Sequence, residues 1–190
     1  MKTKFILFLC ICCTVAFSCR SGPREKQAPT PQAGLATDNA TVQRLITDYA
    51  GMRENAFVAS AWIAANFTLK DCSSVTMQPV QNYSSMAYPQ AQERIEAALR
   101  EATADTAKNP GGTPVVVTSA ITAMHGKPGF LKRFSPSYED MPSIELEVVF
   151  LDARSQRAVV KFCHMTRAKD TDQALDQLLR DITAFLDKKP

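Results

Sequence analysis

The stretch that decides the fold spans residues 144–165 and reads IELEVVFLDARSQRAVVKFCHM. Apolar and polar positions alternate over 144–151, which is the period-two pattern of a strand with one buried face. Residues 157–165 alternate in the same way. Because only the short polar segment 152–156 separates these two runs, the sequence predicts an antiparallel β-hairpin.

Further strands and helices are expected around this hairpin. Apolar residues three and four positions apart predict helices over 41–52, from Pro89 to the break at 109–112, and over 175–186, the last capped by Asp170 and Gln173. Runs rich in Val, Ile and Thr, or short and apolar, predict strands at 59–64, 74–80 and 113–124. Strands clustered between helices and joined by a hairpin indicate an α+β fold: an antiparallel sheet with helices packed on one face, a two-layer sandwich.

The N-terminal residues have the features of a secretory signal. Lys2 and Lys4 precede an almost wholly apolar run over 5–17, and small residues lead to Cys19. A basic start, an apolar stretch of this length and small residues before the cut predict a signal peptide over residues 1–18. A cysteine placed directly after the cut resembles a bacterial lipobox, which implies that the Cys19 thiol is lipidated. The alternative is an ordinary secreted protein with a chance cysteine.

Residues 19–40 differ in composition from the rest of the chain. Prolines and glycines lie among polar residues and alanines, and no apolar period is present. This composition predicts a flexible tether behind the lipidated cysteine, followed by a single periplasm-facing domain over 41–190. After removal of residues 1–18, 20 basic residues face 19 acidic ones. Such a balance argues against a nucleic-acid partner, which favours a clustered basic surface.

Two cysteines remain in the domain. Of the six in the chain, three lie in the signal peptide and Cys19 is the expected anchor, which leaves Cys72 and Cys163. In an oxidising compartment these two could form a disulfide. Two unpaired, hydrophobic cysteines are the alternative.

Several runs resemble a family of uncharacterised bacterial envelope lipoproteins, catalogued as domains of unknown function. The similar runs are Trp62-Ile63-Ala64, Val75-Thr76-Met77-Gln78-Pro79-Val80 and Ile144-Glu145-Leu146-Glu147, and the resemblance covers roughly residues 60–165. The resemblance implies a periplasm-facing lipoprotein and carries over no functional residues.

The sequence offers no pattern for catalysis, a metal or a cofactor. It contains no nucleophile elbow, P-loop or dinucleotide-binding glycine motif. His125 and His164 are expected at strand ends or on the surface, and the scattered Cys and His residues lack the spacing of a zinc site. Glu145 and Glu147 are expected on a solvated strand face, where Glu147 would face Lys161 across the hairpin.

The most unusual stretch is the long connection over 124–143. Connections of this length are uncommon unless they serve binding or lack order. It carries aromatic side chains beside cations, namely Phe130, Lys132, Arg133, Phe134 and Tyr138. One interpretation is a loop that folds back over an open end of the core. The other is a surface that contacts a partner protein or the membrane.

Three functional hypotheses follow from this sequence. The first is a non-catalytic lipoprotein that acts as a binding or accessory subunit of an envelope assembly, held to the membrane through Cys19. The second is a module that binds a lipid or small ligand between sheet and helices. An enzyme is the third and least favoured. Because Arg20 follows Cys19 in place of the aspartate that retains some lipoproteins in the inner membrane, the outer membrane is the expected location.

Overall fold

A computed structural model describes residues 43–106, 109–126 and 141–188, all of which belong to one compact unit over 39–190. The strands are β1 (Ser60–Ile63), β2 (Cys72–Met77), β3 (Gln81–Asn82), β4 (Thr113–His125), β5 (Ser143–Asp152) and β6 (Ala158–Arg167). The helices are α1 (Pro89–Ala104), α2 (Thr171–Lys188) and the 3-10 turn η1 (Leu69–Asp71). Neither α1 nor α2 is long and apolar enough to span a bilayer, and the other described residues contain no such helix.

All six strands belong to one sheet. Its order is β1-β6-β5-β4-β2, and β3 pairs with β4 beyond β2. The β1, β6, β5 and β4 strands are antiparallel neighbours, whereas β2 and β3 run parallel to β4. The expected α+β two-layer architecture is confirmed, with a mixed sheet. The parallel pairs arise because α1 lies between β3 and β4 in the sequence. This helix carries the chain back to the end of the sheet at which β2 began, so β4 runs in the same direction as β2 and β3.

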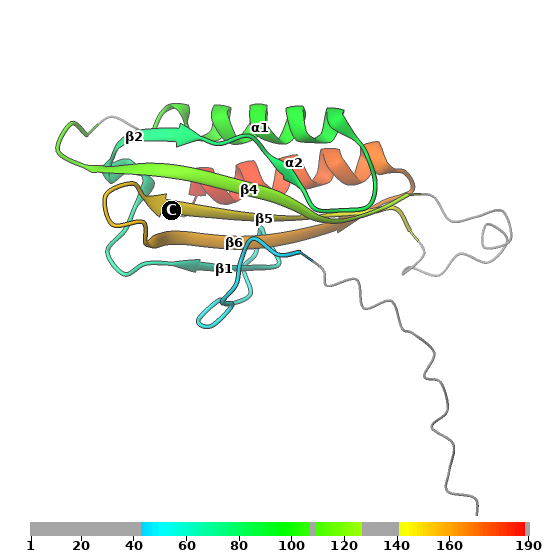
Figure 1. The fold of residues 1–190 in the computed structure, drawn as a ribbon, viewed down its shortest axis with the longest axis horizontal. Coiled ribbons are helices and arrows are strands. Elements are labelled where there is room, and N and C mark those ends of the chain that lie inside the picture. The colour runs from blue at the N-terminus through cyan, green and yellow to red at the C-terminus, as the bar shows by residue number, and fades with distance from the viewer. Residues whose placement is uncertain (1–42, 107–108, 127–140, 189–190) are drawn as a thin grey trace, which may run out of the picture. The chain divides into compact units, whose positions relative to one another are not determined.

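The two helices lie side by side against one face of the sheet (Figure 1). Contacts join α1 to β2, and α2 to β5 and β6. The alternate residues of β5 that face the helices are wholly buried, as are the apolar stripes of α1 and α2; these residues are Ile144, Leu146, Val148, Phe150, Ala91, Ile95, Leu99, Leu175, Leu178 and Phe185. The core therefore fills the layer between helices and sheet.

The expected hairpin is confirmed as β5 and β6. Val148 pairs with Phe162 across it, and the phenyl ring of Phe162 packs on that of Phe185 with centroids 4.9 Å apart. At the turn, the Asp152 carboxylate accepts hydrogen bonds from the Arg154 N–H at 2.8 Å and from the Ser155 hydroxyl at 3.0 Å. The bond from the Arg154 N–H is the main reason that the pKa of Asp152 lies below its usual value.

One helix that the sequence predicts is absent. The apolar period over 41–52 predicted a helix, but the described part of this segment, 43–52, is an irregular chain that lies on the sheet. Its apolar period has a different origin, because Ile46 is buried against the sheet while its backbone binds a side chain of β5. The predicted cap of the last helix is present, since the Asp170 carboxylate accepts a hydrogen bond from the Gln173 N–H at 2.8 Å.

Candidate functional site

Glu147 is the most unusual polar residue of the domain. It lies on β5 at a position whose side chain points away from the helices, and its side chain is 0% exposed. Its carboxylate accepts hydrogen bonds from four groups of the N-terminal segment: the Arg44 guanidinium at 3.0 Å, the Leu45 N–H at 2.7 Å, the Ile46 N–H at 2.9 Å and the Tyr49 hydroxyl. We call this arrangement the Glu147 clamp.

The clamp overturns the expectation that Glu147 is exposed. The strand pattern placed it correctly on the face opposite the helices, but that face is covered here by a segment about one hundred residues earlier in the chain. Arg44 extends the contact to the rim of this cover, where it binds Glu145 at 2.5 Å and the Thr122 hydroxyl at 3.3 Å. A burial that depends on such a distant segment leaves no local signal in the sequence.

Arg44 lies between two carboxylates, those of Glu145 and Glu147, and Tyr49 binds the second of them. A hydrogen bond to Glu145 is the largest cause that raises the pKa of Arg44, and burial followed by the bond to Glu147 raises the pKa of Tyr49. Both groups therefore keep their protons near neutral pH and act as donors to the carboxylate. With four donors on its two oxygens, Glu147 has little capacity left to bind a substrate. Its role is structural: it holds the N-terminal segment on the sheet. A buried carboxylate is tolerated only when it is paired and hydrogen-bonded, and this segment supplies the partners.

A second set of contacts holds the same segment further along. Lys161 donates to the Asp48 carbonyl at 2.6 Å and lies 5.2 Å from the centroid of the Trp62 ring. Gly51, with a φ of +78°, passes so close to Trp62 that a Cβ there would lie 3.1 Å from the ring. A bridge from Arg53 to Ala61 then joins the segment to β1. We call residues 44–53 the strap. Lys161 thus serves the strap and does not face Glu147, whose neighbour on β6 is Cys163.

His164 is bound on both ring nitrogens. Its Nδ1 accepts the Ala59 N–H at 3.1 Å, and its Nε2 lies 2.9 Å from the Asp181 carboxylate. Since a backbone N–H can only donate, Nδ1 must be unprotonated and Nε2 carries the hydrogen that Asp181 accepts. The histidine is only 12% exposed and joins β6 to α2, contrary to the expectation of a surface histidine.

His125 and Cys163 do not form a catalytic pair. His125 is exposed at the end of β4, opposite Ser143, whereas Cys163 lies opposite Glu147, which pairs with Ala120. The two side chains are thus separated by strand β5 and by the four positions from Ser143 to Glu147 along it, which correspond to roughly 13 Å.

The two domain cysteines are free thiols. Cys72 begins β2 and Cys163 lies on β6, with β4 and β5 between those strands. Adjacent strands lie about 4.8 Å apart, so these cysteines exceed the Cα separation of roughly 7 Å that a disulfide tolerates. The disulfide alternative is therefore not supported by the structure. Burial raises the pKa of the Cys72 thiol to about 11. Among the described residues, no group of three or more His, Cys, Asp or Glu side chains is arranged to bind a metal.

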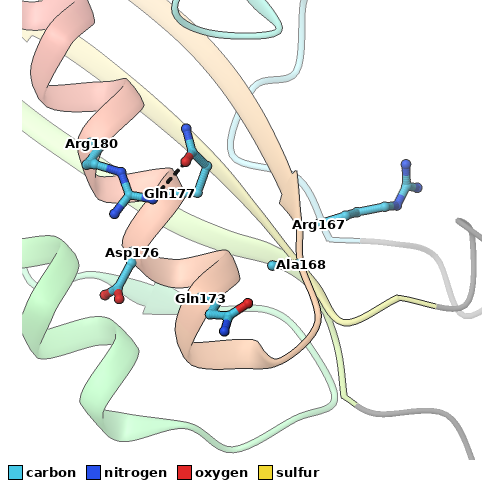
Figure 2. Close-up of a pocket in the computed structure, with 6 residues that line it drawn as sticks. All are labelled: Arg167, Ala168, Gln173, Asp176, Gln177 and Arg180. Atoms are coloured by element: carbon cyan, nitrogen blue, oxygen red, sulfur yellow. Dashed lines mark hydrogen bonds between the residues drawn. The ribbon is translucent and has the colours of Figure 1, made fainter.

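A polar depression of about 340 Å³ lies where β6 leads into α2; its lining is Arg167, Ala168, Gln173, Asp176, Gln177 and Arg180 (Figure 2). Arg180 donates to Gln177 at 2.7 Å, and Asp176 accepts from Arg94 of α1. Figure 2 shows Arg167 extending away from the helix that carries Arg180, so the two guanidinium groups do not converge on one point. This depression lies on the surface and differs from the apolar cavity between sheet and helices that a lipid-binding module would use.

The remaining predicted site residues lie outside the described residues. These are the lipidation site Cys19 and the loop residues Phe130, Lys132, Arg133, Phe134 and Tyr138. The strands reach further than expected, so β4 and β5 take up both ends of the predicted connection, with His125 paired to Ser143. Arg44 binds Glu145, two residues from Ser143. Arg44 and the described ends of the connection therefore lie at one end of the sheet.

No protein-family model and no curated protein sequence matches the chain, whereas several solved structures are similar to part of it. A PelC dodecamer from Paraburkholderia phytofirmans matches with 13% identity and a TM-score of 0.45, covering 67% of this chain and 93% of that one. A DUF330 protein from Xanthomonas campestris matches with 10% identity and a TM-score of 0.38 over 66% and 85%. A candidate lipoprotein from Caulobacter crescentus CB15 matches with 13% identity and a TM-score of 0.34 over 58% and 93%. These similarities assign no role to this chain.

Proposed function

We propose that the protein is a lipid-anchored envelope lipoprotein whose domain acts as a non-catalytic binding or accessory subunit of an envelope assembly. The observation that carries the proposal is the N-terminal sequence, in which a basic start, an apolar run and small residues lead directly to Cys19 and a tether follows. Two or more acyl chains on Cys19 would hold the domain stably, because each buried methylene contributes about 0.8 kcal/mol. The outer membrane is the location that we propose.

The start of the strap and the described ends of the long connection lie at the same end of the sheet. The strap fastens the chain behind the tether to the sheet beside Glu145, near both ends of the connection between β4 and β5. This connection carries Phe130, Lys132, Arg133, Phe134 and Tyr138, a mixture of aromatic anchors and cations that is typical of protein interfaces. We propose these residues as the surface that meets the partner protein.

Anchoring is tested by replacing Cys19 with Ala and fractionating the cells. The expected result is that the variant leaves the membrane pellet, whereas the wild-type protein stays in it until detergent is added. Cys13→Ala is the matched control, because it changes a cysteine of the signal peptide without removing the acylated thiol. A Cys19→Ala variant that still pellets at high salt would exclude the lipid anchor.

The binding surface is tested with two double variants, Phe130→Ser with Phe134→Ser and Lys132→Gln with Arg133→Gln. Each is isolated by affinity from detergent-solubilised envelopes, and its associated proteins are identified by mass spectrometry. We expect both variants to melt at the wild-type temperature and to lose the same associated protein. A lowered melting temperature in the Phe variant alone would show that the connection covers the core instead. Retention of every associated protein by two folded variants would exclude the surface.

A further inference from the structure

The β2 strand forms one edge of the sheet. Within the described residues, β4 pairs with one side of β2 and no strand pairs with its other side. The start of this edge is occupied, because the Asn109 N–H donates to the Cys72 carbonyl at 3.2 Å, and Pro79 follows the strand. Between them runs Ser73-Ser-Val-Thr-Met-Gln78, which contains no charge and no proline. Proteins usually place charged residues or proline on an exposed edge, because an unprotected edge is a template for another strand.

The register shows which backbone groups of β2 point outward. The Gln78 N–H donates to the Val117 carbonyl at 2.9 Å, so Gln78 bonds toward β4. Since alternate residues of a parallel strand bond to the same side, Thr76 also bonds toward β4. The N–H and C=O groups of Val75 and Met77 therefore point away from the sheet, toward the open side.

The side chains of this edge match a second copy of themselves. If two β2 strands pair antiparallel with Thr76 at the centre, Val75 of each copy lies opposite Met77 of the other and exchanges backbone bonds with it. Val75 and Met77 pack against the core on the helix side, so this pairing sets apolar side chains against each other there. On the other side the exposed Thr76 meets its own counterpart, a favourable cross-strand pair. No like charges oppose each other within β2.

From this self-complementary edge we infer that β2 is a dimerisation surface, at which two copies of the chain join their sheets through antiparallel pairing centred on Thr76. Such a contact is isologous and closes on itself as a two-fold dimer. Its symmetry axis runs perpendicular to the sheet, so both copies turn the face that carries the strap to the same side. Both straps then begin on that side, as the lipid anchors proposed above would require of two chains in one membrane.

Cysteine cross-linking of the full chain in its own membranes tests the inference. At the centre of the pairing, Thr76 and its counterpart form a pair that is not hydrogen-bonded, with Cα atoms about 4.5 Å apart, within disulfide range. A Thr76→Cys variant should therefore give a homodimer on mild oxidation. Ser74→Cys is the matched control, because Ser74 would lie roughly 13 Å from its counterpart. No dimer from Thr76→Cys, or equal dimer from both variants, would overturn the inference. The same pair in the Cys19→Ala background separates loss of anchoring, read by fractionation, from loss of dimer, read by cross-linking.

A charge-exchange experiment tests the same contact without cysteines. Thr76→Lys and Thr76→Glu each place like charges at the symmetry axis, so each variant alone should be monomeric by light scattering in detergent. Because Thr76 is exposed, both variants should keep the wild-type melting temperature. When produced together with different affinity tags, the two variants should co-purify, because opposite charges then meet. Failure of the mixed pair to associate, or dimers of either variant alone, would show that β2 is not the contact.

Discussion

At the scale of single residues, the buried carboxylate of Glu147 holds the start of the strap against the sheet. It is removed from water entirely, and its four donors come from residues 44–49. A carboxylate in that position stabilises the strap only while its donors remain, and the strap in turn provides the polar partners that make the burial tolerable. The two features therefore depend on each other.

Replacing Glu147 by Gln is expected to lower the free energy of unfolding by about 3 kcal/mol, because an amide brings N–H groups toward donors that need an acceptor. Urea unfolding of the purified protein measures the change. Glu145→Gln is the control, since Glu145 binds the partly exposed Arg44 and this change should cost less than about 1 kcal/mol. Equal losses in the two variants would contradict the clamp.

Cys72 gives a prediction that depends on pH. Its thiol is buried with a pKa of about 11, so at pH 8 it should resist iodoacetamide in the folded protein and react after unfolding. A raised folded pKa contributes stability below the unfolded value near 8.5, and that contribution is lost as the pH rises toward 11. The wild-type protein should therefore lose more stability between pH 9 and 11 than Cys72→Ala does. Parallel slopes for the two proteins would show that the thiol is not responsible.

At the scale of elements, α2 closes the core against β5 and β6. Its buried stripe is the one that the sequence predicted, and its start is fixed by the Asp170 cap. In proteins, helices are stabilised mostly by packing of an amphipathic face and less by intrinsic propensity. Most of the stability of α2 must therefore come from the apolar side chains that it buries.

Leu178→Ala and Ile182→Ala should each lower the free energy of unfolding by about 2–5 kcal/mol, the range for truncating a fully buried aliphatic side chain. Both side chains are at most 1% exposed. Arg180→Ala, on the exposed side of the same helix, should stay within about 0.5 kcal/mol of wild type. Urea unfolding of the three variants, fitted with a common m-value, measures these changes in the free energy of unfolding. A cost for Leu178→Ala as small as that of Arg180→Ala would mean that α2 does not pack as described.

At the scale of the whole molecule, the strap lies within the compact unit that spans residues 39–190. Residues before 41 are expected to be dispensable for folding, because their composition cannot bury a core. The strap, by contrast, covers part of the open face and belongs to the domain, although it contains no helix and no strand.

Two truncated chains test this boundary. A chain that begins at Thr41 keeps the whole strap and should melt within a few degrees of the mature protein. A chain that begins at Glu54 loses Arg44, Tyr49 and the backbone donors of Glu147, and should melt far lower or fail to fold, because a buried carboxylate is left without partners. Thermal unfolding followed by circular dichroism compares them. Similar melting temperatures for both chains would place the strap outside the cooperative unit.

The sequence by itself determined the α+β class, the β5–β6 hairpin and the helices α1 and α2. In each case the signal is local, because the period of apolar residues reports which face of an element is buried. The same locality explains the error over 41–52, where the period is compatible with a helix but the backbone donors of Leu45 and Ile46 bind Glu147 instead.

Only the tertiary structure decided how distant segments meet. The parallel pairing of β2 and β3, the burial of Glu147 beneath the strap and the bonds of His164 to Ala59 and Asp181 all join residues far apart in the chain or on different elements. Such contacts depend on which segment of the chain covers each face of the sheet. A strand with polar residues at alternate positions has the same sequence pattern whether water or another segment covers that face. For this reason the sequence predicted the two faces of β5 correctly and could not predict that both are covered.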